Sequence, residues 1–72
     1  MVVLKSIISP DSKYCVDVFI RSDGTFGFEE YRRDVEDYNR WFPIGRFSSI
    51  SRHSKEDVFN EALTHIDWLK VI

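Results

Sequence analysis

Hydrophobic and polar residues alternate through the first half of the chain, which is the pattern of β-strands. Residues 2–8 form a β-favouring run that ends at the turn sequence Ser9-Pro10-Asp11-Ser12. Residues 14–21 then alternate with a period of two, which predicts a strand with two distinct faces. One face carries Tyr14, Val16, Val18 and Ile20, and the other carries Cys15, Asp17, Phe19 and Arg21.

A tight hairpin is indicated by Asp23-Gly24, which lies between two β-favouring runs. Tight hairpin turns need a positive φ angle, which glycine adopts without a steric clash. The turn therefore predicts that the strand before it pairs antiparallel with residues 25–33. Phe28 then lies on one face and Tyr31 on the other, so Tyr31 is either exposed or brought back by a bulge near Gly27.

The last strand is expected from Arg40 to Ser48, after a polar loop over residues 34–39. Pro43 has no amide hydrogen to donate to a ladder, so this strand should lie at a sheet edge or be bulged there. An exposed strand edge of this kind can dock a partner. The residues expected to add to the core from this strand are Trp41, Phe42, Ile44 and Phe47.

An amphipathic helix is predicted from about Lys55 onwards. Ser54, followed three residues later by Asp57, matches the pattern that caps a helix N-terminus. The terminal run, residues 68–72, is apolar, so we expect Trp68 in the core and the chain end docked on the domain. The apolar residues that recur at three- and four-residue spacing are Val58, Phe59, Ala62, Leu63, Ile66 and Leu69.

Together these elements predict a single α+β domain over residues 1–72. Its architecture is a three- to four-stranded antiparallel β-meander, from about residue 2 to residue 48, with one C-terminal amphipathic helix packed on one sheet face. With 72 residues, of which 43% are hydrophobic, the core is small. Such a core supplies roughly 3–5 kcal/mol of net stability, and natural domains of this size often add a disulfide, a metal or a partner chain.

The cysteine and histidine content argues against the first two additions. Cys15 is the only cysteine, so no intrachain disulfide can form, and its position in a strand predicts a small buried hydrophobe in a reducing compartment. His53 and His65 have no second thiol or zinc-binding spacing, so no metal is expected. Residues 1–8 are too few for a signal-peptide core or a membrane span, which predicts a cytoplasmic protein without membrane association. A partner chain remains the expected addition.

No group of residues in the sequence requires catalysis or a cofactor to explain it. The acids of the third strand and the following loop are interleaved with Arg32 and Arg33, which is typical of a solvated face rather than of a catalytic carboxylate pair. Gly24, Gly27 and Gly45 are scattered and form no phosphate-binding loop. We therefore expect a protein that is not an enzyme and binds no cofactor.

The aromatic residues are more numerous than a small core readily hides, and several lie near arginines in the sequence. This composition is typical of the centres of protein interfaces. It predicts a protein-interaction or regulatory module that binds a protein partner or a second copy of itself as a homodimer. The predicted interaction surface consists of Tyr31, Arg32, Arg33, Tyr38, Arg40, Trp41 and Arg46.

Nucleic-acid binding by the β-sheet face is the alternative function. In this hypothesis the four arginines of the predicted surface contact phosphates, and its aromatic residues stack on bases. The formal net charge is −2, from 12 acidic and 10 basic residues, so the chain has no general attraction to a polyanion. The alternative therefore requires the arginines to form one local patch.

The order of strands followed by a helix resembles, in topology, the plant AP2/ERF DNA-binding domain and the arm-binding domains of some phage integrases. The run from Trp41 to Phe47, followed by a helix containing Ala62, is similar to the aromatic strand and alanine-rich helix of AP2/ERF domains. The sheet of that family is strongly basic, whereas here acids such as Asp17 and Glu29 would flank the phosphates. No DNA-contacting residue is therefore carried over.

The pattern as a whole also resembles small bacterial proteins of unknown function, and this similarity covers most of the chain. It implies a free-standing bacterial domain and no particular activity. The residues that carry it are Asp23-Gly24-Thr25-Phe26, Glu29-Glu30-Tyr31-Arg32-Arg33-Asp34, Glu36-Asp37, Trp41, Pro43 and Trp68-Leu69.

Overall fold

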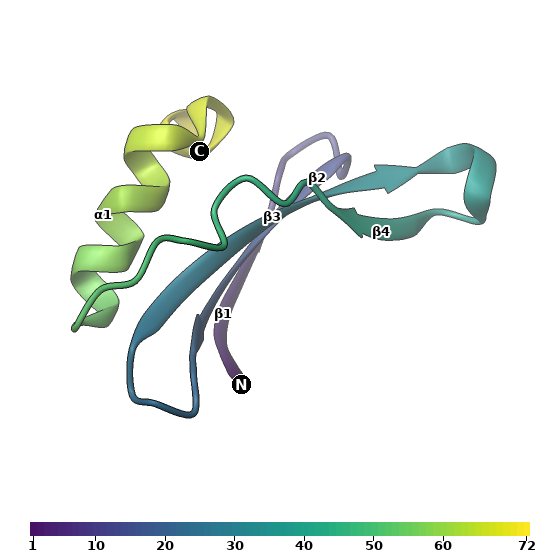
Figure 1. The fold of residues 1–72 in the computed structure, drawn as a ribbon. Coiled ribbons are helices and arrows are strands. Elements are labelled where there is room, and N and C mark those ends of the chain that lie inside the picture. Colours follow the sequence, from purple (N-terminus) through teal and green to yellow (C-terminus); the bar gives the residue numbers. More distant parts are fainter.

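The computed structural model describes residues 1–72, apart from the side chain of Val35. Its four strands form one open sheet in the order β1-β2-β3-β4, and neighbouring strands are antiparallel. The helix α1 packs on one face of this sheet (Figure 1). The predicted α+β meander with one C-terminal helix is therefore confirmed. The strands are β1 (Val2–Ile8), β2 (Tyr14–Ile20), β3 (Phe26–Asp34) and β4 (Arg40–Pro43).

The hairpin between β2 and β3 forms at the predicted turn. Gly24 has a φ angle of +86°, and its amide donates to the carbonyl of Arg21 across 3.0 Å. The carboxylate of Asp23 accepts from both the amide and the hydroxyl of Thr25. These hydrogen bonds lower the pKa of Asp23 below its ordinary value. The turn sets the β2–β3 register, which runs without a shift along the whole hairpin.

A β-bulge lies in β1. The alternative bulge near Gly27, which the sequence allows, does not form. The pairing of β1 with β2 shifts between Val3 and Lys5. Gly27 has a different role, because a Cβ at this position would collide with the guanidinium of Arg21. That guanidinium crosses β3 at Gly27 and donates to the backbone carbonyls of Phe26 and Ile50, across 3.2 and 3.1 Å.

The last strand is shorter than the sequence predicts. β4 ends at Pro43, and not near Ser48, because the chain leaves the edge of β3 after Ile44 and pairs with it again only at Arg52. Arg52 exchanges two backbone hydrogen bonds with Phe26 there, across 2.9 and 3.0 Å. As expected from Pro43, β4 is an edge strand. Between β3 and β4 the chain forms a short 3-10 helix, η1 (Val35–Asp37).

The helix begins where predicted and ends earlier than its apolar stripe suggests. α1 spans Lys55–His65, and the hydroxyl of Ser54 accepts from the amide of Asp57 across 3.1 Å. Ile66 then adopts an extended conformation, and a second 3-10 helix, η2 (Asp67–Val71), follows. Among the described residues, no helix is long and apolar enough to cross a membrane.

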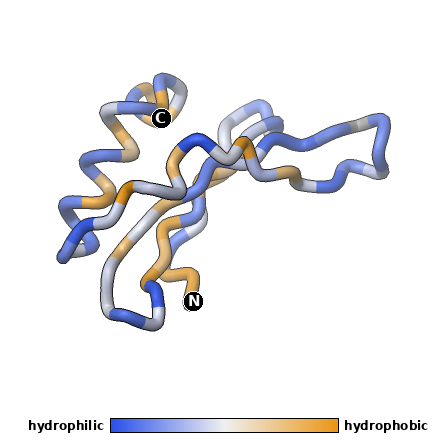
Figure 2. Tube along the Cα trace, in the orientation of Figure 1, coloured by the Kyte–Doolittle hydropathy of each residue, from blue (hydrophilic) through white to orange (hydrophobic). Residues whose placement is uncertain are grey.

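The core lies between α1 and the two central strands. Figure 2 shows hydrophobic and hydrophilic positions alternating along α1. It also shows that the end of the β3–β4 hairpin is mostly hydrophilic. Trp68 packs against the edge of the core but is only half-buried, and Val71 and Ile72 are exposed, so the chain end is docked only as far as Leu69. The buried core residues are Val16, Val18, Phe28, Phe47, Val58, Ala62, Ile66 and Leu69.

Candidate interaction surface

α1 leaves one face of the sheet uncovered, and we call this the helix-free face. Val16, Val18 and Phe28 point toward α1, so by the alternation of side chains their neighbours along β2 and β3 point away from it. Cys15 and Asp17 of β2 and their partners on β3 therefore share this face, as the period of two predicts. The partners are Tyr31, opposite Cys15, and Glu29, opposite Asp17.

A shallow hollow of about 420 Å³ lies on the helix-free face. It receives side chains from all four strands, because the sheet brings β1 and β4 to either side of the central hairpin. Its walls combine aliphatic, aromatic and acidic groups. The lining residues are Ser6, Ile8, Cys15, Asp17, Tyr31 and Trp41.

At the β4 side of the hollow, Tyr31 and Trp41 are brought together with Arg33. Arg33 lies directly opposite Trp41 in the β3–β4 ladder, and its guanidinium carbon is 4.3 Å from the centroid of the indole ring. This is the geometry of a cation–π contact. The Nε atom of Arg33 is buried and has no hydrogen-bond partner among the described residues. Arg33 also forms no ion pair among the described residues.

An acidic pair occupies the centre of the helix-free face. Asp17 and Glu29 lie directly opposite each other in the β2–β3 ladder, and like charges in this position destabilise a sheet. The hydroxyl of Ser6 donates to Asp17 across 2.6 Å, and Glu29 accepts from the amide of Gly45 across 3.1 Å. Neither carboxylate forms an ion pair among the described residues.

Burial and these acids act together on Tyr31. Its burial, with the carboxylates of Asp17 and Glu29 nearby, raises the pKa of its hydroxyl above the ordinary value. Tyr31 is thus a neutral hydrogen-bond donor and acceptor beside two negative charges at neutral pH.

Cys15 lies under this hollow as a free, buried thiol, as the sequence predicts. Its Sγ is 3.6 Å from the carboxylate of Asp17. Burial first, and then the negative charge of Asp17, raise the pKa of Cys15 to about 11. A thiol of this kind is protonated at neutral pH, so it acts as a small apolar side chain and not as a nucleophile.

The other residues of the predicted surface lie elsewhere. Arg32 is opposite Phe42 in the β3–β4 ladder, on the sheet face that α1 packs against. Arg40 also extends over Phe42, and its guanidinium carbon is 6.0 Å from the centroid of the Phe42 ring. Tyr38 is 91% exposed in the hairpin connection, where it adopts a left-handed φ of 58°. Six of the seven predicted residues are therefore divided between two faces and a hairpin tip.

Arg46 has a separate role next to the core. Its guanidinium donates to the carboxylate of Glu30 across 3.5 Å and lies 5.0 Å from the ring centroid of Phe47. Glu30 is 5% exposed and also accepts from the indole N–H of Trp68 across 2.8 Å. The four arginines of the nucleic-acid hypothesis thus do not form one patch, since Arg33, the Arg32–Arg40 pair and Arg46 lie in three different surroundings.

Several residues of the surface were not singled out as candidates from the sequence. Ser6 and Ile8 join the hollow only because β1 pairs with β2 in this register. The available signal was the hairpin at Asp23-Gly24, which fixes the pairs that cross the face. This signal does not reach β1, whose bulge the sequence does not indicate.

Among the described residues, no group of three or more histidine, cysteine, aspartate or glutamate side chains is placed to hold a metal ion. Comparison with protein-family profiles, with curated proteins and with solved structures gives no match. The similarities to bacterial proteins of unknown function and to AP2/ERF domains therefore stay predictions.

Proposed function

We propose that this protein is a non-enzymatic interaction module that associates with a second copy of itself through the helix-free face. The observation that carries the proposal is the grouping of Tyr31, Trp41 and Arg33 beside the hollow, on the sheet face that α1 leaves open. Tyrosine, tryptophan and arginine are the residues that contribute most to protein interfaces when they are enclosed.

The charges of this face favour a second copy as the partner. The acidic pair Asp17 and Glu29 forms no ion pair among the described residues, and neither does Arg33 on the same face. A two-fold axis through the hollow would bring Arg33 of each copy against the acidic pair of the other, which makes the face self-complementary. The same pairing would relieve the repulsion between the two carboxylates.

Nucleic-acid binding has less support from this geometry. A phosphate-binding sheet needs several cations on one face. Here the helix-free face carries an acidic pair at its centre, and Arg32 and Arg40 belong to the opposite face. We therefore favour the protein partner over the polyanion.

The test is the dependence of molar mass on protein concentration, measured by sedimentation equilibrium from about 1 to 500 μM, which spans weak and moderate interfaces. We expect a monomer–dimer equilibrium. Trp41→Ala should weaken it by about 30-fold, the effect of a hot-spot residue worth about 2 kcal/mol. The matched control is Tyr38→Ala, which removes an aromatic side chain outside the helix-free face.

A charge exchange tests the two-fold arrangement itself. Arg33→Glu and Asp17→Arg should each weaken the dimer, because each places like charges in contact. The double variant should restore dimerisation, since the exchanged charges meet again across the axis. Arg40→Glu, which makes the same charge change on the other face, should have no effect. A chain that is monomeric throughout the range, or a dimer indifferent to Arg33→Glu, contradicts the proposal.

A further inference from the structure

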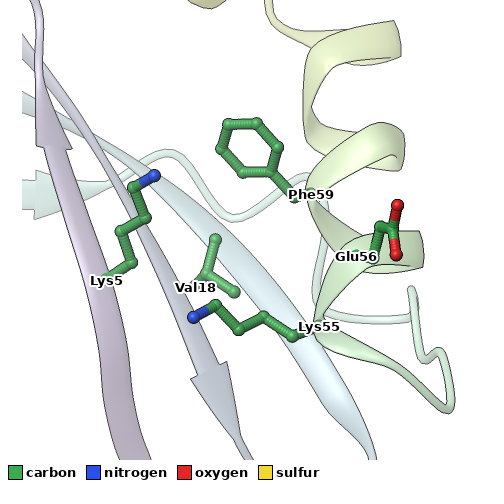
Figure 3. Close-up of a pocket in the computed structure, with 5 residues that line it drawn as sticks. All are labelled: Lys5, Val18, Lys55, Glu56 and Phe59. Atoms are coloured by element: carbon green, nitrogen blue, oxygen red, sulfur yellow. The ribbon is translucent and has the colours of Figure 1, made fainter.

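A groove runs between α1 and β1 on the opposite side of the sheet from the helix-free face. α1 packs mainly on β2 and β3, so the helix-facing side of β1 is open around Lys5, although Ile7 of the same strand packs against the core. The groove has a volume of about 330 Å³, and Val18 and Phe59 form its apolar floor (Figure 3). Lys5, Lys55 and Glu56 also line it.

The bulge in β1 places a lysine in this groove. Val3 lies opposite Phe19, and the next paired residue, Lys5, lies opposite Val18. In an uninterrupted ladder Leu4 would occupy the position opposite Val18, beside the apolar floor. The bulge thus exchanges a leucine for a lysine on the inward side of the strand. Bulges are known to redirect side chains next to functional sites.

Lys55 brings a second ammonium group to the same groove. It is the first residue of α1, where the helix dipole disfavours a cation. Figure 3 shows its side chain extending toward Val18, and that of Lys5 extending toward Phe59. The Nζ atom of Lys5 is 5.0 Å from the centroid of the Phe59 ring. The stability of the helix therefore does not explain why a lysine stands at this position.

Neither ammonium group belongs to an ion pair in the described part of the chain. The ion pairs among the described residues involve Arg46, Arg52, His65 and Lys70, and none includes Lys5 or Lys55. Glu56 lines the groove with its stem, but Figure 3 shows its carboxylate directed away from both lysines. Two cations therefore lie over an apolar floor without an ion-pair partner among the residues that the structure describes.

We propose that the groove binds a small amphipathic carboxylate, with the head group between Lys5 and Lys55 and the hydrocarbon on Val18 and Phe59. The size follows from the volume: at roughly 30 Å³ for each heavy atom, the share of a water molecule in the liquid, the groove admits about eleven. A medium-chain acid such as octanoate, with about ten heavy atoms, fits this limit. The charge follows from the two unpaired lysines.

The experiment is a titration of the ¹⁵N- and ¹³C-labelled chain with octanoate, below its micelle-forming concentration, followed by NMR. Saturable shifts are expected at Val18 and Phe59. Acetate, which lacks the hydrocarbon, and octanamide, which lacks the charge, should each bind at least tenfold more weakly. Added salt should weaken octanoate binding, because the lysines lie at the surface.

Three variants separate a built site from general attraction by positive charge. Lys5→Met and Lys55→Met should each weaken octanoate binding by about tenfold, since each removes one charge-assisted contact. Lys13→Met makes the same charge change in the exposed β1–β2 turn and should leave the affinity unchanged. Methionine keeps the apolar stem, and the amide spectrum of each variant checks that it folds.

The outcomes decide between a built carboxylate site and general attraction by positive charge. Equal losses in Lys13→Met and Lys5→Met, equal binding of octanamide, or shifts that spare Val18 and Phe59 would each overturn the proposal. The molar mass of Lys5→Met is measured in parallel. If the variant loses octanoate binding because it self-associates, that result counts against the proposal. Because the groove and the helix-free face lie on opposite sides of the sheet, failure here leaves the proposed dimer untouched.

Discussion

Trp68 donates its indole N–H to the buried carboxylate of Glu30 across 2.8 Å, and so joins η2 to the middle of β3 over 38 positions of sequence. Trp68 also stacks on Tyr14, with 6.4 Å between the ring centroids. The contact fixes the end of the chain beyond α1 against the sheet. It also satisfies a carboxylate that would otherwise be costly to bury.

Removing this acceptor should destabilise the domain. Glu30→Ala leaves the indole N–H without its partner, and we expect a loss of about 2–3 kcal/mol in the free energy of unfolding. Trp68→Phe should cost less, about 1–2 kcal/mol, because Glu30 keeps its contact with Arg46. Urea unfolding followed by circular dichroism measures both. The control is Glu56→Ala, which removes an exposed glutamate and should change the free energy of unfolding little. If Glu30→Ala changes the free energy of unfolding as little as this control, the contact contributes little.

Gly27 and Arg21 should be coupled energetically. A Cβ at Gly27 displaces the guanidinium from the carbonyls that it binds, so Gly27→Ala should cost about 1–3 kcal/mol in an otherwise unchanged chain. In an Arg21→Ala background the same change meets no guanidinium, and its cost should fall to near zero or change sign. A double-mutant cycle by urea unfolding measures this coupling, and additive effects would argue against it.

Cys15 should react slowly in the folded protein. With its pKa raised from 9.0 to about 11, the thiolate fraction at pH 8 falls about 100-fold. Higher intrinsic nucleophilicity offsets part of this, so we expect a reaction with an aromatic disulfide reagent at least tenfold slower than in the urea-unfolded chain. Asp17→Asn removes the second cause of the shift and should speed the reaction. Equal rates in folded and unfolded chains would contradict the assignment.

The same pKa implies a pH dependence of stability. The folded state holds the thiol proton more tightly than the unfolded state, so this contribution is complete below about pH 9 and is lost as the pH rises through about 11. Other groups titrate in that range as well. The difference between the wild-type chain and Cys15→Ala, measured by urea unfolding from pH 8 to 11, isolates the thiol. A constant difference would mean that its pKa is not raised.

The order of the elements could be predicted because local signals agreed with the tertiary fold. The alternation along β2, the turn at Asp23-Gly24 and the cap at Ser54 each act within a few residues. They also placed Asp17 and Tyr31 on the face away from the helix. The end of β4 could not be predicted, because the pairing of Arg52 with Phe26 is a contact between distant parts of the chain.

Only part of the candidate surface could be predicted, because strand register decides which residues share a face. Trp41 and Arg33 become neighbours through the β3–β4 register, whereas Arg32 and Arg40 alternate to the other face. Proximity in sequence could not separate these pairs. The sequence also grouped Glu30 with the solvated acids, although its alternation with Phe28 places it on the core side. The bulge that re-aims Lys5 left no sign in the composition of β1.

The contacts that the chain makes with β3 beyond β4 also bear on aggregation. The outer edge of β3 is occupied by β4 at one end, by Ile44 at Glu30, and by Arg52 at Phe26. A strand added to the meander would have to lie along β1, where the bulge breaks the regular spacing of backbone donors and acceptors, or along β4, which spans only Arg40–Pro43 and ends in a residue without an amide hydrogen. Edge-to-edge polymerisation of the folded chain is thus disfavoured on both sides. Fibre formation would therefore require the C-terminal third of the protein to detach first.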